Sequence, residues 1–371
     1  MEEKELLKIQ KQDVAKTSDS GQPIEGSQQL SLFGAEGYYL ANWDNLHTSS
    51  ILQRPTGEHY QSLLNAITTG ALNKLPIKGK ITRWGASYDA VYTLENITGI
   101  TQKNSQNIAT LFEIYLSAVL QNCWDYEKMA LKQDFFYLSY KAVRQVEIVS
   151  ENNPNIVNTI RSYHKNITSF VIEAKPSKDN KQKKSFFIQG QDRALFMRDI
   201  DFVKSEKGKD NGHAIIHLNP NTMTWQVFLS TYVGALFVWK TKIKNSKARA
   251  FVNYCEFRIR TNAKKGTPCK VSFDLALEKI NIDINGRVGA NSQKYKPKKF
   301  LLDVVIPEIE ETQRRYCLHN EDGTPDPNLY FEIDKEKEII TFYPSKRDKK
   351  VLDYITKRDK HTKKKHTQLT Y

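Results

Sequence analysis

Hydrophobic residues in the first half of the chain fall into helical stripes followed by short strand-like runs. Apolar side chains recur every three or four positions over 57–72 and again over 108–119, which predicts two helices. The sequence Asn-Asn-Pro at 152–154 places an N-cap before a first-turn proline and predicts a helix through about His164. Two predicted strands, 169–173 and 185–189, follow and are joined by a Lys-rich turn.

The second half repeats this order. Helices are predicted at 233–244 and 246–260, and another begins near Pro297 with an apolar stripe behind it. Ser139 and Ser272 each precede an aromatic residue and a short amphipathic run, which predicts a capped short helix in both halves. Strands are expected at 316–319, 329–333 and 338–343. Helices followed by a β-hairpin, twice over, predict an α+β fold of tandem winged helix-turn-helix domains with β-hairpin wings.

Length and composition suggest how the 371 residues divide. Residues 1–30 are polar and nearly free of aromatic side chains, so we expect a disordered arm. We expect an N-terminal winged-helix domain at 31–225 and a C-terminal one at 226–344. Ten Lys and Arg against three Asp make 345–371 a basic tail suited to phosphate contacts of low sequence specificity.

The charge of the chain indicates its class of partner. Lys and Arg number 56 against 42 Asp and Glu, a formal net charge of +14, which favours nucleic acid through phosphate neutralisation. No apolar stretch approaches the roughly 20 residues that a membrane span requires. The four cysteines lie far apart, which predicts reduced, buried thiols in a cytoplasmic protein. Neither a cofactor nor a structural metal is expected.

Candidate DNA contacts follow from the predicted motif, because its second helix enters the major groove while flanking elements hold phosphates. Cations crowd the start of the helix at Pro297, where the helix dipole also favours a phosphate. Others lie on the helix after Pro154, together with Asn158 and His164, and in the turn at 175–184. The resulting candidates are Arg161, Lys165, Lys181, Lys183, Lys184, Arg287, Lys294, Lys296, Lys298 and Lys299. The second wing is acidic, so its tip should face away from DNA.

Two segments carry a resemblance to a known family. The run Ile-Lys-Asn-Ser-Lys-Ala-Arg-Ala-Phe at 243–251, followed by Asn253-Tyr254, resembles the segment before the helix-turn-helix in plasmid replication initiators of the Rep-3 type. Residues 295–309 are similar to the recognition helix of that family and to the Glu-Ile that ends it, although Pro307 departs from the pattern. The resemblance adds Lys247 and Arg249 to the expected DNA contacts.

The resemblance implies a non-catalytic DNA-binding protein. Such a protein recognises direct repeats at a replication origin, helps to open the duplex and recruits a host initiator and the replicative helicase. A homodimer is implied as well, because members of the family dimerise to repress their own promoters. A DNA-binding transcription regulator shares all of these sequence features and stays an open alternative.

The enzyme alternative is a metal-dependent nuclease. Glu173 and Lys175 form a Glu-x-Lys on a predicted strand, as in restriction-endonuclease-like folds, but no Asp lies between positions 135 and 172 to complete the set. His213 and His217 would share one face of a strand and could meet Cys269 or Cys317 at a metal. No second spaced pair of ligands accompanies them, so ordinary structural histidines are the simpler interpretation. No catalytic residue is therefore expected.

Overall fold

A computed structural model describes the chain from Ile51 to Ser345. All described residues belong to one compact unit, Ala41–Tyr371. The arm expected at 1–30 and the tail expected at 346–371 lie outside the described residues, as do several internal stretches: 84–85, 126–127, 129, 151–152, 178–192, 204–211, 221–224, 226–227, 229–231, 264–267 and 289–294.

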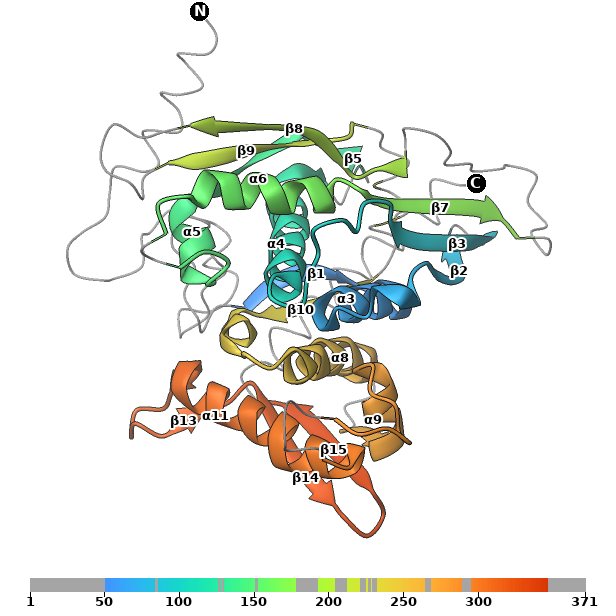
Figure 1. The fold of residues 1–371 in the computed structure, drawn as a ribbon, viewed down its shortest axis with the longest axis vertical. Helices are drawn as coiled ribbons and strands as arrows, with labels where there is room; N and C mark the ends of the chain where they lie inside the picture. Colours follow the sequence, from blue (N-terminus) through green and yellow to red (C-terminus); the bar gives the residue numbers. More distant parts are fainter. Residues whose placement is uncertain are drawn as a thin grey trace, which may run out of the picture. The chain divides into compact units, whose positions relative to one another are not determined.

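The first of two winged-helix modules is built around a long buried helix and a three-stranded antiparallel sheet (Figure 1). We call it module 1. The strand order in its sheet is β6-β9-β8, so β9, the last of the three strands in the sequence, lies in the middle. Its elements are α4 (Ser105–Ala118), β6 (Phe135–Ser139), α5 (Tyr140–Gln145), α6 (Ile156–Ile167), β8 (Phe196–Val203) and β9 (His213–Leu218).

The second module, module 2, repeats this arrangement. Its sheet order is β11-β15-β14, again with the last strand in the middle. The same sequence of helix, strand, short helix, third helix and hairpin therefore occurs twice, which confirms the predicted tandem winged-helix fold. Its elements are α8 (Ser246–Ala263), β11 (Cys269–Ser272), α9 (Phe273–Lys279), α10 (Pro297–Phe300), η5 (Leu301–Val305), α11 (Ile306–Tyr316), β14 (Leu329–Asp334) and β15 (Ile339–Pro344).

The short second helix of each module begins and ends in the same way. Ser139 and Ser272 occupy the N-caps of α5 and α9, as predicted, and the Ser272 side chain accepts a hydrogen bond from the N–H of Leu275. One residue past each C-cap the backbone is left-handed, with φ of 57° at Glu147 and 60° at Asn281. Matching caps at matching positions support a common design for both modules.

The remaining elements join the two modules. Strand β1 pairs with β10 in an antiparallel ribbon, although residues 57–231 lie between them in the chain, and β3 pairs with β2 and β7 in a further three-stranded sheet. Helix α3 packs against both α4 and α8. In Figure 1, α8 lies between α3 and the other elements of module 2. The bounds are β1 (Ile51–Thr56), α3 (Glu58–Thr69), η1 (Leu72–Lys74), β2 (Ile77–Arg83), β3 (Ala86–Leu94), η2 (Val119–Cys123), β4 (Trp124–Asp125), β5 (Ala130–Leu131), β7 (Phe170–Pro176), β10 (Tyr232–Phe237), η4 (Val238–Lys242), β12 (Leu318–His319) and β13 (Pro325–Asp326).

Two predicted elements differ from the structure. The helix expected at 233–244 is strand β10 followed by the single 3₁₀ turn η4, because its apolar run pairs with β1 far away in the chain. Of the first wing expected at 169–189, the described strand β7 pairs with β3. The hairpin of module 1 is β8–β9 instead, and the predicted strand 185–189 lies outside the described residues. Helix α6 starts at Ile156 with Asn155 as N-cap, two residues later than the Asn-Pro signal indicates.

Pro307 does not end the third helix of module 2. A π-helical turn, η5, precedes α11, and Pro307 occupies the first turn of α11, where its missing N–H costs least. The helix continues to Tyr316, so Glu308 and Ile309 lie inside it and do not terminate it. The Glu308 carboxylate instead accepts hydrogen bonds from the backbone N–H groups of Lys244 (2.9 Å) and Asn245 (2.8 Å), just before α8.

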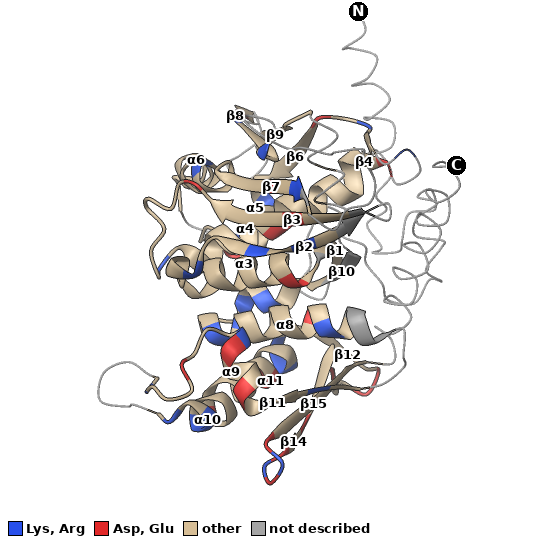
Figure 2. Cartoon of the chain, turned by 90° about the vertical axis from the view of Figure 1, so that its right-hand side faces the viewer, with Lys and Arg blue, Asp and Glu red and all other residues tan. Residues whose placement is uncertain are grey.

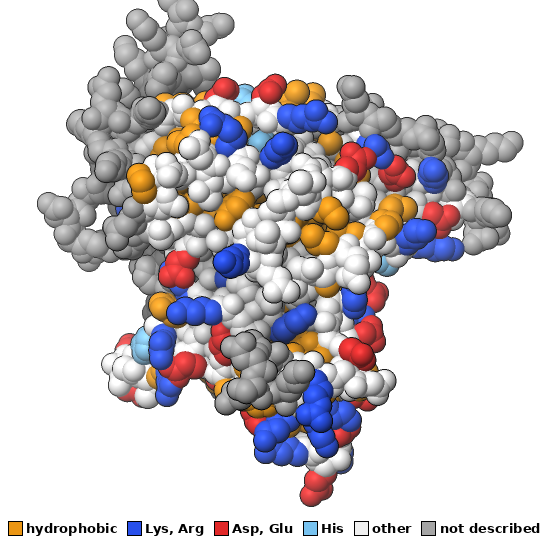
Figure 3. Space-filling model, in the orientation of Figure 1, with side chains coloured by type: hydrophobic (Ala, Val, Ile, Leu, Met, Phe, Trp, Pro, Cys, Tyr) orange, Lys and Arg blue, Asp and Glu red, His pale blue; other side chains and the backbone are white. Residues whose placement is uncertain are grey.

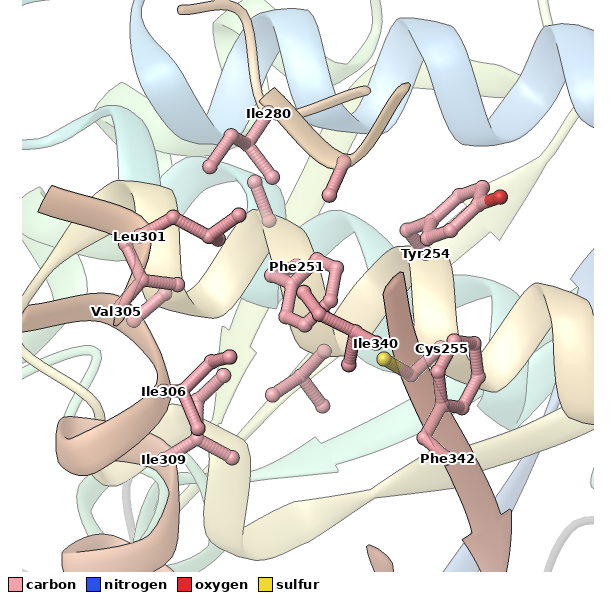
Figure 4. Packing of buried hydrophobic residues seen from close by; sticks show 14 of the residues in the cluster. Phe251, Tyr254, Cys255, Ile280, Leu301, Val305, Ile306, Ile309, Ile340 and Phe342 are labelled. Carbon is pink, nitrogen blue, oxygen red and sulfur yellow. The ribbon is translucent and has the colours of Figure 1, made fainter. Parts of the chain in front are cut away.

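The core of module 2 is continuous and apolar (Figure 4). Phe251 on α8 is fully buried and points toward the third helix on one side and β15 on the other. Leu301, Val305 and Ile309 supply the helix side of this contact, and Phe342 supplies a ring from β15 with its centroid 6.3 Å from that of Phe251. The packing fixes the third helix against α8, so its opposite face is left for solvent.

Four buried charges connect the modules. Arg54 on β1 and Lys240 on η4 lie between Glu113 on α4 of module 1 and Glu256 on α8 of module 2, and none of the four is more than 2% exposed. The Lys240 ammonium donates to Glu113 (2.8 Å), Glu256 (2.8 Å) and Asn253 (2.7 Å). Arg54 lies 3.1 Å from Glu113 and 2.9 Å from Glu256. Two positive and two negative groups balance, as a dry interior requires.

Candidate nucleic-acid interface

The third helix of module 1, α6, presents a continuous polar face. Asn158, Arg161, Ser162 and Lys165 are exposed at spacings of three and four, while Ile156, Ile160 and Ile167 are buried on the other side. Asn and Arg are side chains that read base edges in a major groove, and Lys contacts phosphate. The composition of the face therefore suits a helix inserted into duplex DNA. Ser162 was missed by the sequence reasoning, although it follows Asn158 at helical spacing.

Arg161 is positioned by neighbours before any ligand arrives. Its guanidinium lies 4.9 Å from the centroid of the Phe202 ring on β8, and Nη1 donates to the Asn158 side chain at 3.2 Å. Contact with an aromatic face restricts the guanidinium without removing its charge. Arg161 and Lys165 therefore lie at the surface where the sequence predicted them.

His164 does not lie on this polar face. The ring is buried under β8, within 3.1 Å of both the Tyr115 hydroxyl and the backbone carbonyl of Met197. A carbonyl oxygen only accepts, so Nε2 donates to Met197 and neutral Nδ1 accepts from Tyr115. Burial lowers the pKa of His164 to about 4, which keeps the imidazole neutral. The prediction that it belongs to the outer side of the helix is wrong.

Acid should therefore loosen module 1. Because the pKa of His164 is about 4 in the folded protein and near 6.5 when unfolded, the unfolded state binds a proton first as the pH falls. We expect its contribution to the free energy of unfolding to drop by about 2 kcal/mol between pH 7 and pH 5. Denaturant titrations of the wild type and His164→Gln over this range measure the effect, with exposed His319→Gln as the control. A pH dependence equal in both variants would contradict it.

In module 2 three exposed cations lie at or just before the start of the third helix. Lys296 is the N-cap of α10, Lys299 lies in its first turn, and Arg287 lies in the preceding loop; all three are exposed. The ribbon of α10 is partly blue in Figure 2, the colour of Lys and Arg, and Figure 3 shows Lys and Arg side chains gathered over this end of module 2. Farther along the helix Asp303 and Glu310 are exposed, and the exposed Arg314 and Arg315 near its end are ion-paired with Glu311. The helix N-terminus is thus the part of this face suited to a phosphate backbone.

Lys298 differs from its neighbours. Its ammonium lies 2.6 Å from the carboxylate of Glu338, at the end of the β14–β15 turn, and 3.4 Å from Asp274 on α9. The hydrogen bond that the Lys298 ammonium donates to Glu338 is the main reason that the pKa of Lys298 is raised. Lys298 therefore points toward two acidic groups of its own module, whereas the sequence predicted a phosphate contact.

The two residues that the family resemblance added are structural in this fold. Arg249 is buried and donates to the Thr110 hydroxyl (2.9 Å) and to backbone carbonyls of Gln106, Thr241 and Ile243. Arg249 is not available at the surface, so the prediction that it is a surface contact to DNA is wrong. Lys247 donates to the carbonyl of Asn281 at 3.0 Å, and burial lowers its pKa to about 8.

Four predicted contacts lie outside the described residues: Lys181, Lys183, Lys184 and Lys294. The acidic second wing is described. Glu332 and Asp334 lie on β14, and Glu336 and Glu338 lie in the turn before β15; Figure 2 colours this hairpin red and blue at its tip. The hairpin itself is confirmed, and its orientation away from a polyanion stays a prediction.

The residues of the nuclease alternative do not form a metal site. Glu173 and Lys175 share a face of β7, and β3 places Asp89 directly opposite Lys175. The Glu173 carboxylate, however, is ion-paired with the guanidinium of Arg193, which also contacts Glu95 at 2.6 Å. A cation already lies where a catalytic metal would need to bind. Among the described residues no three His, Cys, Asp or Glu side chains group closely enough to hold a metal.

The histidines and cysteines have structural surroundings. His213 and His217 share the outer face of β9, and His217 lies 2.9 Å from Asp201 on β8. All four cysteines are buried thiols that form no disulfide, as predicted from their spacing. No described helix has both the length and the apolar character needed to cross a bilayer.

Comparisons with solved structures give matches at low identity, among them the three that follow. No model of a known protein family matches the sequence, and no curated protein does. The Pi initiator protein crystallised with iteron DNA is 7% identical, with 80% of this chain and 97% of that chain covered and a TM-score of 0.38. RctB domains 2–3 are 12% identical, with 74% and 93% covered and a TM-score of 0.35. A selenomethionine form of domains 2 and 3 of RctB is 10% identical, with 76% and 98% covered and a TM-score of 0.37. The first of these is an initiator protein, as are members of the family that the sequence resembles. Because all three TM-scores are below 0.5, the function proposed for this chain rests on its own residues.

Proposed function

We propose that the chain is a sequence-specific double-stranded DNA-binding protein that acts as a replication initiator in the cytoplasm. Each winged-helix module contributes its third helix, α6 or α10–α11, to a groove of the duplex. The main observation in support is that one winged-helix topology occurs twice, each time with exposed cations on the third helix. A net charge of +14 supports the same class of ligand. No bond is made or broken in this activity.

Two third helices held at a fixed separation suit a DNA site of fixed length. The modules are joined by buried ion pairs and by Arg249, so their spacing along DNA is set by the protein. A half-site separation fixed in this way favours binding to an array of identical repeats. We therefore propose origin direct repeats as the target, with domains at 31–225 and 226–344 each holding one contact. Opening of the origin, a host initiator, the replicative helicase and a homodimer belong to this proposal as partners and later steps.

Selection of bound duplexes from a random pool tests the proposal. We expect a recurring motif long enough for two groove contacts on one face of the helix. Footprinting on that motif then separates the initiator from the transcription regulator. An initiator protects several direct repeats and sensitises an adjacent AT-rich stretch, whereas a regulator protects a single operator. Recovery of no motif at moderate ionic strength would exclude specific DNA binding.

The salt dependence of binding measures the phosphate contacts at module 2. Replacing Arg287, Lys296 and Lys299 by Ala should reduce the slope of log affinity against log salt by about three, because each lost contact releases one counterion fewer. The exposed Lys78, Lys103 and Lys128, replaced by Ala in a second variant, keep the same net charge as this triple variant and lie on other elements. Equal slopes for the two triple variants would place the DNA elsewhere.

A further inference from the structure

Module 2 contains a three-way ionic contact that has no counterpart among the described residues of module 1. Lys298, second residue of α10, lies 2.6 Å from Glu338 and 3.4 Å from Asp274. Asp274 is the second residue of α9, and Glu338 directly precedes β15. One ammonium thus contacts the second helix, the third helix and the wing. In winged helices these are the elements that meet DNA together.

The corresponding positions of module 1 carry no such contact. The second residues of α5 and α6 are Lys141 and Val157, and the residue before β9 is Gly212. The backbone arrangement is nevertheless shared, because Tyr140 N–H donates to Gly212 O at 3.0 Å and Phe273 N–H donates to Glu338 O at 2.9 Å. Gly212 has no room for a side chain, since an added Cβ would lie 2.4 Å from the Tyr140 ring. At these three described positions the ionic contact is thus present in module 2 and absent from module 1.

Glu338 accepts an unfavourable backbone conformation at this position. Its φ is 51°, in the left-handed region that favours Gly or Asn. The turn holds its carboxylate over the start of α10, where Lys298 meets it. A charged residue in a conformation better suited to glycine indicates that the side chain has a role there.

We propose that Lys298 is a positioning residue for DNA recognition: through Glu338 and Asp274 it fixes the wing and α9 against the start of the third helix. This inference rests on the proposed function. Lys299 and Lys296 then approach DNA at a set angle, while the Lys298 charge is already matched by two carboxylates. Lys298 therefore contributes to the DNA sequence specificity and adds little to the salt-dependent affinity for phosphates. Its neighbours in the protein sequence, Lys296 and Lys299, are the proposed phosphate contacts.

The comparison of Lys298→Met with Lys299→Met tests this. We expect Lys299→Met to lower the salt slope by about one and to weaken binding to all duplexes alike. Lys298→Met should leave the slope unchanged and reduce the ratio of specific to non-specific affinity about tenfold, comparable to one lost base contact. Partly exposed ion pairs add little to stability, so the unfolding midpoint of Lys298→Met should move only slightly.

A double-variant cycle identifies the partner. If Lys298 acts through Glu338, then Glu338→Gln should lower the specificity ratio too, and the combined variant should lose no more than Lys298→Met alone. A drop of about one in the slope for Lys298→Met would make it a phosphate contact and overturn the proposal. An unchanged specificity ratio would overturn it as well. Failure of the wild type to select any motif would instead refute the proposed function itself.

Discussion

Glu256→Gln should lower the free energy of unfolding by about 3–5 kcal/mol, the usual cost of removing one partner from a buried ion pair. Glu256 is 1% exposed, and its carboxylate faces Lys240 and Arg54 while accepting the backbone N–H of Phe237 at 2.6 Å. Burial raises the pKa of Glu256, and the two cations oppose that shift. With a neutral amide at this position, two buried positive charges would share only Glu113.

Denaturant midpoints measure this loss, and Glu58→Gln supplies the matched control. Glu58 is exposed and its nearest cation, Lys279, is 3.8 Å away, so removing its charge should change stability by less than about 0.5 kcal/mol. A second variant that removes both Glu256 and Lys240 in favour of Met should recover part of the loss, since no uncompensated charge then remains. A change below about 1 kcal/mol for Glu256→Gln would show that water reaches the group.

Patterns within one module could be predicted from the sequence. The polar face of α6 follows from the spacing of Asn158, Arg161 and Lys165, and the hairpin β14–β15 from alternation around a turn at Asp334. The Ser139 and Ser272 caps were also correct. Each of these signals is local, because the residues that define it lie within one turn or one strand of each other.

Features that depend on distant pairing were not predictable. The run at 233–237 is a strand because β1 lies beside it, and strand β7, expected in the first wing, pairs with β3, whose residues lie about 80 positions earlier in the chain. Charged residues are mostly exposed, so nothing in the sequence distinguishes Arg54 or Lys240 from surface cations. Their burial follows from partners about 60 and 130 positions away, Glu113 included. For the same reason Arg249 was mistaken for a surface contact.

Arg249→Lys should cost about 3 kcal/mol of stability or more, although both side chains are cations. The Arg249 guanidinium on α8 donates through Nη1 to the Thr110 hydroxyl and Gln106 carbonyl of α4, and through Nη2 to Thr241 and Ile243. A single ammonium cannot reproduce this fork, so buried acceptors are left without donors at about 1–3 kcal/mol each. Burial lowers the pKa of Arg249 to about 10, so it stays protonated at neutral pH and its hydrogen bonds keep their charge-assisted strength.

The effect of this substitution on DNA binding separates a structural role from a contact role. Arg249 joins the first helices of the two modules, so Arg249→Lys should lower the unfolding midpoint while the folded fraction keeps the salt slope of the wild type. Arg198→Lys, an exchange at an exposed position of β8, should change neither quantity. If Arg249→Lys reduced the slope of log affinity against log salt and left the stability unchanged, Arg249 would be a DNA contact. We expect the opposite pattern, because the buried Arg249 side chain donates to three carbonyls and a hydroxyl and has no donor facing solvent. A substitution of the exposed Lys299 should, in the same assays, reduce the salt slope and leave the unfolding midpoint unchanged.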